Sequence, residues 1–189
     1  MAICEELAGA REQQPMREAT IAWRVLEALD RLGLPYERIP IDPEHADTAT
    51  FCEQYGYPPD RSANTIIVTS RKNPKRYAAC VGRASTRLDF NHTVRRLMGV
   101  SRLSFATEEE ARELTGMAIG GVTVIGLPKD LPIYVDEGLI EFDYVILGAA
   151  TVRRRSRSLR RCFFACRTCK SSRVSPCRGL SDPVDASIG

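Results

Sequence analysis

Histidine, the commonest metal ligand and general base of proteins, is scarce in this sequence. The chain has two histidines, His45 and His92, which lie far apart and without the spacing of metal ligands. Cys52 and Cys80 are isolated thiols with no histidine partner that can be assigned, so we expect them to be small buried hydrophobic residues. Phosphate-binding glycine loops and dinucleotide-binding motifs do not occur. We therefore expect neither a metal nor an organic cofactor.

Long hydrophobic runs are also missing. Every apolar stretch is broken by charge or glycine within the length of a strand, which argues against a membrane span and a membrane partner. The first residues, MAICEELAGAREQQP, are polar and acidic, so we expect no secretory leader and a cytoplasmic location. With 189 residues and 43% hydrophobic residues, the chain is typical of one globular domain.

Charge is distributed unevenly along the chain. The segment 151–189 holds 10 of the 27 Lys and Arg residues but only 2 of the 24 Asp and Glu residues. The rest of the chain is consequently acidic. An acidic globule with a basic tail can indicate nucleic-acid binding.

The segment 16–148 predicts interleaved helices and strands, hence an α+β fold with a mixed sheet and packed helices. Expected helices cover 16–30, 48–55 with an Asp47 or Thr48 cap, 91–97 capped by Asn91, and 107 onward with a Thr107–Glu110 capping box. Expected strands cover 35–41, the hairpin 65–71 and 76–82, and the segments 131–136 and 142–148.

Three hypotheses account for the tail, Thr151 to Gly189. It is a disordered basic arm, a small zinc site, or the product of a shifted reading frame. Cys166 and Cys169 form a single C-x-x-C, and Cys162 and Cys177 do not supply the second ligand pair that a zinc ribbon needs.

The frameshift hypothesis rests on the genetic code. CRTCKSSRVSP can be encoded so that the register one base upstream gives LPDLQVVEGLA, and AATVRRR likewise permits GGNRSAK. Both products have protein-like patterns that the arginine-rich tail lacks. An out-of-frame tail would leave a sheet edge unpaired, so we expect a disordered tail and weak self-association.

Several segments carry a family resemblance in their order and spacing. They are SANTIIV from Ser62, YAACVG from Tyr77, RLDF from Arg87, the block from Glu109 to Pro128 that contains GGVTVIGLP, and the later LPIYVDEGL and FDYVILGA. Together they resemble the YbaK and prolyl-tRNA synthetase-associated editing domains, and the shifted-frame GGNRSAK resembles the motif that follows the last strand in that family.

The resemblance implies a single α+β domain with a mixed, barrel-like sheet over residues 16–150, preceded by an extension (1–15) and followed by the tail (151–189). It also implies an aminoacyl-tRNA deacylase that acts in translation fidelity. Its substrate is the aminoacyl ester at the 3′ end of tRNA, and DNA is not an expected partner.

The candidate catalytic residues are Asn64, Gly120 and Gly121. Backbone N–H groups of a glycine-rich turn can stabilise the oxyanion that forms when water attacks an ester, although glycines there can equally serve only to turn the chain. Asn64 stands where the family has a lysine, and Val124 where it has a proline. The candidate substrate-binding residues are Thr65, Thr123, Gly126 and Asp136; Asp136 could instead cap the turn that follows it.

The lost lysine and the missing C-terminal motif leave two functions open. The chain is an active deacylase, or it is an inactive binding module that keeps the pocket. Asn64 can still orient a substrate hydroxyl through neutral hydrogen bonds.

Overall fold

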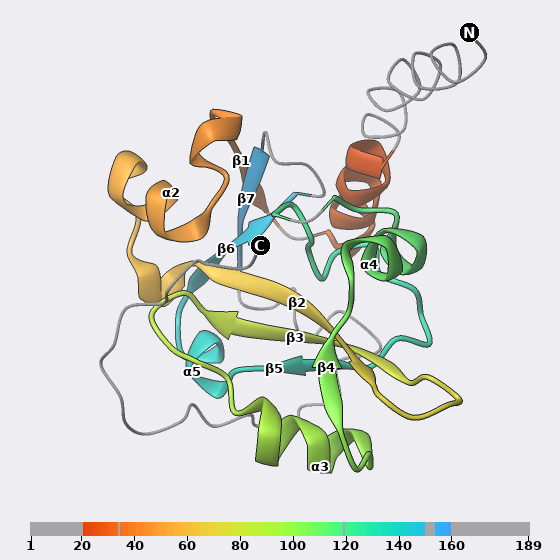
Figure 1. The fold of residues 1–189 in the computed structure, drawn as a ribbon. Coiled ribbons are helices and arrows are strands. Elements are labelled where there is room, and N and C mark those ends of the chain that lie inside the picture. The colour runs from red at the N-terminus through yellow and green to blue at the C-terminus, as the bar shows by residue number, and fades with distance from the viewer. Residues whose placement is uncertain (1–20, 34, 119, 150–153, 160–189) are drawn as a thin grey trace, which may run out of the picture.

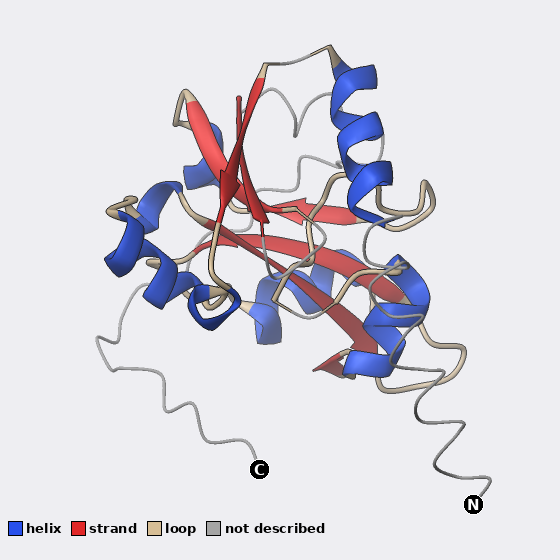
Figure 2. Ribbon diagram, turned by 90° about the horizontal axis from the view of Figure 1, so that it is seen from above, coloured by secondary structure: helices blue, strands red, loops and turns tan. Residues whose placement is uncertain are grey.

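The computed structural model describes residues 21–33, 35–118, 120–149 and 154–159. Two sheets form the centre of the molecule, and helices cover them (Figures 1 and 2). The predicted α+β fold with a mixed sheet and packed helices is confirmed. The extension 1–15 and most of the tail lie outside the described residues.

The four-stranded sheet has the order β4-β2-β3-β5. Strands β2 (Ala63–Ser70) and β3 (Tyr77–Arg83) form the predicted antiparallel hairpin, because each is a β-branched or small apolar run ending in a polar turn. The edge strand β4 (Leu103–Phe105) is antiparallel to β2, and β5 (Ile133–Val135) is parallel to β3. The mixed pairing follows from the helical crossover between β3 and β5.

The three-stranded sheet has the order β1-β7-β6, all antiparallel. Its strands are β1 (Tyr36–Pro40), β6 (Tyr144–Gly148) and β7 (Arg154–Leu159). A parallel bridge between Ser62 and Ile146 joins this sheet to the start of β2. The two sheets therefore meet where β2 begins.

Strand β7 departs from the expectation for the tail. We expected the segment after residue 150 to leave a sheet edge unpaired, but residues 154–159 pair with β1 on one side and β6 on the other. That expectation is wrong for these residues. The remainder, 160–189, lies outside the described part of the chain.

Helices pack on both faces of the sheets. The helix over residues 21–32 and α4 (Glu108–Thr115) cover the largest hydrophobic cluster, which includes Val25 and Leu139. A second cluster lies beneath the helical turn η3 (Phe90–Val94) and the adjoining α3 (Arg95–Met98), and a third beneath α2 (Thr48–Tyr55). The described helices also include η1 (Pro43–His45), η2 (Pro59–Arg61) and α5 (Glu137–Ile140).

Helix caps explain where several of these helices begin. The predicted Asp47 cap and the Thr107–Glu110 capping box are both present. The predicted Asn91 cap is wrong. Asp89 caps η3 instead, because its carboxylate accepts hydrogen bonds from the backbone N–H groups of His92 and Thr93.

Candidate functional site

A cavity of about 230 Å³ opens where the two sheets meet. It lies beside the first half of β2, because β4 pairs only with the last three residues of that strand and leaves the edge before them uncovered. The start of α2, the segment 120–122 and the end of β6 complete its wall. The lining residues are Ala46, Asp47, Thr48, Ala63, Asn64, Thr65, Ile66, Gly120, Val122 and Gly148.

The β2 wall contributes two neutral polar side chains. Asn64 is exposed, and its Oδ1 accepts a hydrogen bond from the hydroxyl of Thr48 at the start of α2. This bond fixes the amide so that its NH₂ group remains a donor. The hydroxyl of Thr65 is buried and has no hydrogen-bond partner among the described residues. A buried hydroxyl without a partner is a group that a ligand or water can satisfy.

The start of α2 contributes Asp47, the only charged side chain among the described residues that line the cavity. Its Oδ2 accepts hydrogen bonds of 3.0 Å from the backbone N–H groups of Ala49 and Thr50, which caps the helix. The hydroxyl of Thr50 also donates to Oδ2, so Oδ1 remains an acceptor. The described part of the cavity wall is therefore neutral to negative and contains no lysine or arginine.

Close backbone contact shapes the opposite wall. A β-carbon added to Gly148 would lie 2.7 Å from the carbonyl oxygen of Val122 and 2.8 Å from that of Gly121. Only glycine permits this approach of β6 to the segment 120–122. Gly120 has a positive φ of 85°, which also favours glycine.

The two candidate catalytic glycines are not equivalent. The N–H of Gly121 donates to the carbonyl of Ala118 at 3.0 Å and closes a turn. Its donor is therefore occupied. Gly120 lines the cavity, so its N–H is the better candidate to stabilise an oxyanion.

Of the residues proposed from the sequence, the structure brings Asn64, Thr65 and Gly120 together in the cavity wall. The side chain of Thr123 is fully buried, and Gly126 lies beside Val25 of the first helix; neither lines the cavity.

Asp136 also lies outside the cavity wall, in a buried polar network. Its carboxylate accepts hydrogen bonds from Arg83 Nε at 2.9 Å, from the Thr86 hydroxyl at 3.2 Å and from the N–H of Gly138 at 3.0 Å. The last bond caps α5, which is the alternative role that the sequence offered. Asp136 fixes the end of β5 against the loop after β3.

Sequence reasoning did not assign Asp47, Thr48 and Gly148 to the site. Asp47 and Thr48 were identified only as a helix start, and Gly148 only as the end of a strand. Gly148 lies far from Asp47 and Thr48 in the sequence, and its contact with the segment 120–122 depends on tertiary packing.

The two described cysteines are unsuited to nucleophilic catalysis, as expected. Burial raises the pKa of the Cys80 thiol to about 12, so the reactive thiolate is not formed at neutral pH. Cys52 is buried and donates to the hydroxyl of Ser62. Within the described ranges, no group of three or more His, Cys, Asp or Glu side chains is placed to hold a metal ion. None of the helices described there is long and apolar enough to cross a bilayer.

Comparison with known proteins places this site in a family. Residues 42–156 match the aminoacyl-tRNA editing domain. Among solved structures, a candidate trans-editing enzyme for prolyl-tRNA synthetase is 26% identical with a TM-score of 0.70, covering 82% of this chain and 96% of its own. The fold is shared with a hypothetical protein, APE2540, at 24% identity and a TM-score of 0.68, covering 80% and 97%. The matched range contains every residue that lines the cavity. The chain belongs to the aminoacyl-tRNA editing domain family.

Proposed function

We propose that this chain is an aminoacyl-tRNA deacylase that removes the amino acid from mischarged tRNA. The observation that carries the proposal is the small cavity between Asn64, Thr65 and Gly120, in a chain of the editing-domain family. The similarity to a candidate trans-editing enzyme for prolyl-tRNA synthetase supports the same activity. A cytoplasmic location follows from that substrate.

The reaction asks little of the protein, because an aminoacyl ester is already activated. The oxygen of a water molecule bonds to the ester carbonyl carbon, and the carbonyl oxygen becomes an oxyanion. The N–H of Gly120 stabilises this charge. The bond from the carbonyl carbon to the ribose oxygen then breaks, a proton from the water passes to that oxygen, and the free amino acid leaves.

Side chains of β2 position the water and the ribose. The Asn64 NH₂ group can donate to a ribose hydroxyl, since Thr48 holds its oxygen. Thr65 has a hydroxyl without a partner among the described residues, which can hold the water. Holding the reactants in place supplies much of the rate enhancement for such a reaction.

Asp47 suits the remaining part of the substrate. An aminoacyl ester carries an α-ammonium group, and the Asp47 carboxylate is the one charge among the described residues of the cavity wall. Asp47 is exposed, so solvent moderates its attraction for the ammonium group, but the opposite charge still favours this orientation of the substrate. The cavity volume of about 230 Å³ favours a small amino acid side chain over a large one.

Among its described residues the cavity wall has no cation, and this favours a second function. Where the family has a lysine this chain has Asn64, and an inactive binding module would keep the cavity without the chemistry. Replacing Asn64 by lysine separates the two. A binding module gains deacylation in Asn64→Lys, whereas an active enzyme loses activity in Asn64→Ala and recovers little of it with lysine.

The direct test is hydrolysis of a panel of mischarged tRNAs by the full chain. We expect release of the amino acid above the buffer rate for at least one small amino acid, and a loss of at least tenfold in Asn64→Ala. A rate equal to buffer for every pair would refute the deacylase. Glu113→Gln, an exposed position on α4 outside the cavity wall, is the control for handling and folding.

A further inference from the structure

A strongly basic surface lies at the far end of β2 from the cavity. Six exposed side chains define what we call the distal cationic patch. They are Arg71, Lys72, Arg76, Arg95, Arg96 and Arg102. None of the six forms an ion pair within the described part of the chain, whereas Arg31, Arg61, Lys75, Arg83 and Arg112 do.

Backbone contacts gather the patch from three segments. The N–H of Arg71, just after β2, donates to the carbonyl of Arg102 at 3.1 Å. In the hairpin turn, Ser70 donates to the carbonyl of Arg76 at 2.9 Å. Arg76 Nη1 lies 3.9 Å from the position of a β-carbon on Gly99, which ends the helix that carries Arg95 and Arg96. The hairpin, the end of α3 and the start of β4 therefore meet at one corner.

Acidic groups near the patch are already engaged. Glu110 pairs with Lys75, and this contact holds the pKa of the Glu110 carboxyl below its usual value. The carboxylate of Asp89 accepts the cap hydrogen bonds of η3, which lower its pKa although burial opposes this. With both of these carboxylates engaged, the six cations without ion pairs among the described residues give the corner a positive potential.

We propose that the distal cationic patch binds the phosphate backbone of the RNA whose aminoacylated 3′ end enters the cavity. This rests on the proposed function. Affinity for RNA comes largely from Lys and Arg contacts to phosphates, and neither residue lines the cavity within the described part of the chain. The six cations of the patch can supply these contacts.

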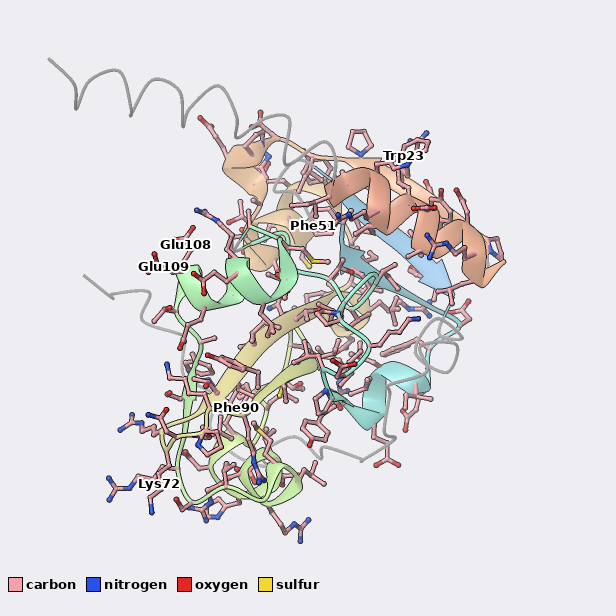
Figure 3. The ribbon with its side chains drawn as sticks, turned by 90° about the vertical axis from the view of Figure 1, so that its right-hand side faces the viewer. Trp23, Phe51, Lys72, Phe90, Glu108 and Glu109 are labelled. Carbon is pink, nitrogen blue, oxygen red and sulfur yellow. The ribbon has the colours of Figure 1, made fainter. Side chains whose placement is uncertain are left out.

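The distance fits a polymer rather than a nucleotide. From Asn64 to Arg71 the strand β2 extends for about 24 Å at the usual rise per residue. In Figure 3, Lys72 lies at the lower edge of the molecule, far below Phe51 of α2, the helix whose start lines the cavity. A ligand that reaches both the cavity and the patch must therefore be several nucleotides long.

Phe105 adds a feature that favours nucleic acid over an acidic protein. It lies on β4, three residues after Arg102, with 60% of its surface exposed. Its ring contacts Phe90 edge-on, with ring centres 5.1 Å apart, so the face is held in place. Exposed aromatic rings next to cations are the surface on which single-stranded bases stack.

The experiment compares two triple variants of the full chain that remove the same charge. The patch variant is Arg71→Gln, Arg76→Gln and Arg102→Gln; the control is Arg24→Gln, Arg31→Gln and Arg38→Gln, all exposed and carried by the first helix and β1 rather than by the segments that form the patch. Binding of uncharged tRNA is titrated between about 50 and 200 mM salt. We expect the patch variant to raise Kd at least tenfold and to lower the salt slope by about two, and the control to change Kd less than threefold.

Hydrolysis separates this proposal from the proposed function. The patch variant should lose hydrolysis of mischarged tRNA but retain it for an aminoacylated trinucleotide too short to reach the patch. If the patch variant binds tRNA more weakly and the native chain hydrolyses neither substrate, the result supports the patch and refutes the deacylase. Equal effects of the two triple variants overturn the patch. A patch variant that loses binding to phosphatidylserine vesicles but not to tRNA overturns it as well.

Discussion

The two sheets differ in how well their sequences suit their positions. In the four-stranded sheet, the inner strands β2 and β3 are apolar and lie between hydrophobic clusters on both faces. In the three-stranded sheet, the inner strand β7 reads RRSRSL, yet it lies between β1 and the fully buried residues of β6. Position 157 pairs with Ile146 and position 155 with Ile39, both buried. The sequences of β2 and β3 are typical of inner strands, whereas the sequence of β7 is not.

This contrast is a reason to test the frameshift hypothesis for the tail, which stays a prediction. Inner strands of a sheet favour aliphatic residues, and the polar sequence RRSRSL is unusual for such a position. The shifted register permits serine, alanine and lysine at positions 153–155 and an aliphatic stretch after them. The site depends on this strand, because β7 supports β6, and β6 ends in the cavity wall at Gly148.

The largest expected effect is therefore the restoration of the alternative frame after Gly148. We expect the melting temperature to rise by roughly 10 °C or more, because two or three newly buried aliphatic side chains contribute about 1.5–3 kcal/mol each. Solubility should rise with it. Calorimetry and light scattering on the two proteins measure both. A chain that already melts cooperatively as a soluble monomer, with residues 160–189 resistant to protease, would contradict the hypothesis.

The next largest effect probes the four-stranded sheet. Asp136→Ala removes the buried partner of Arg83 and the cap of α5 together. We expect a loss of about 3–5 kcal/mol in the free energy of unfolding, since the remaining guanidinium is largely buried and unpaired. Urea denaturation measures it. Asp143→Ala is the control, because the Asp143 carboxylate that pairs with Arg61 is exposed. It should lower the free energy of unfolding by well under half as much.

Gly148→Ala tests the contact between β6 and the segment 120–122, at the junction between the two sheets. The added β-carbon would meet two carbonyl oxygens at less than 3 Å, so the segment 120–122 must move away from β6. We expect about 2 kcal/mol of destabilisation and a loss of deacylation larger than the loss of stability explains. Gly33→Ala is the matched control. It has a positive φ but no atom within 4 Å of its β-carbon, so it should cost stability and leave activity intact.

Local signals made most of the fold predictable. The hairpin follows from β-branched runs around a polar turn, and the starts of α2 and α4 follow from cap residues. The cap of η3 was misassigned because Asp89 and Asn91 offer similar signals, and only the structure shows which side chain reaches the free N–H groups. Such choices between neighbouring polar residues depend on the geometry of the turn.

The site was only partly predictable for a different reason. Asn64, Thr65 and Gly120 were found through a family resemblance. Asp47 and Gly148 are brought to the cavity by the bridge between the sheets and by a glycine contact, and neither leaves a periodic trace in the sequence. The strand β7 could not be predicted from its residues, because RRSRSL has no strand propensity beyond that of any polar segment.

The smallest expected effect concerns the capping box of α4, which packs on the four-stranded sheet. Thr107 and Glu110 exchange hydrogen bonds, and Glu110 also pairs with Lys75. Thr107→Ala should lower the free energy of unfolding by about 1 kcal/mol, as measured by urea denaturation.

The pairing with Lys75 and the backbone bond from Thr107 lower the pKa of Glu110 in the folded state. Its contribution is therefore present above the unfolded pKa and is lost as the pH falls through the folded value. Melting temperatures at pH 7 and near pH 3 should differ by less in Glu110→Gln than in the native chain. An equal difference in the two proteins would show that this glutamate does not contribute to acid sensitivity.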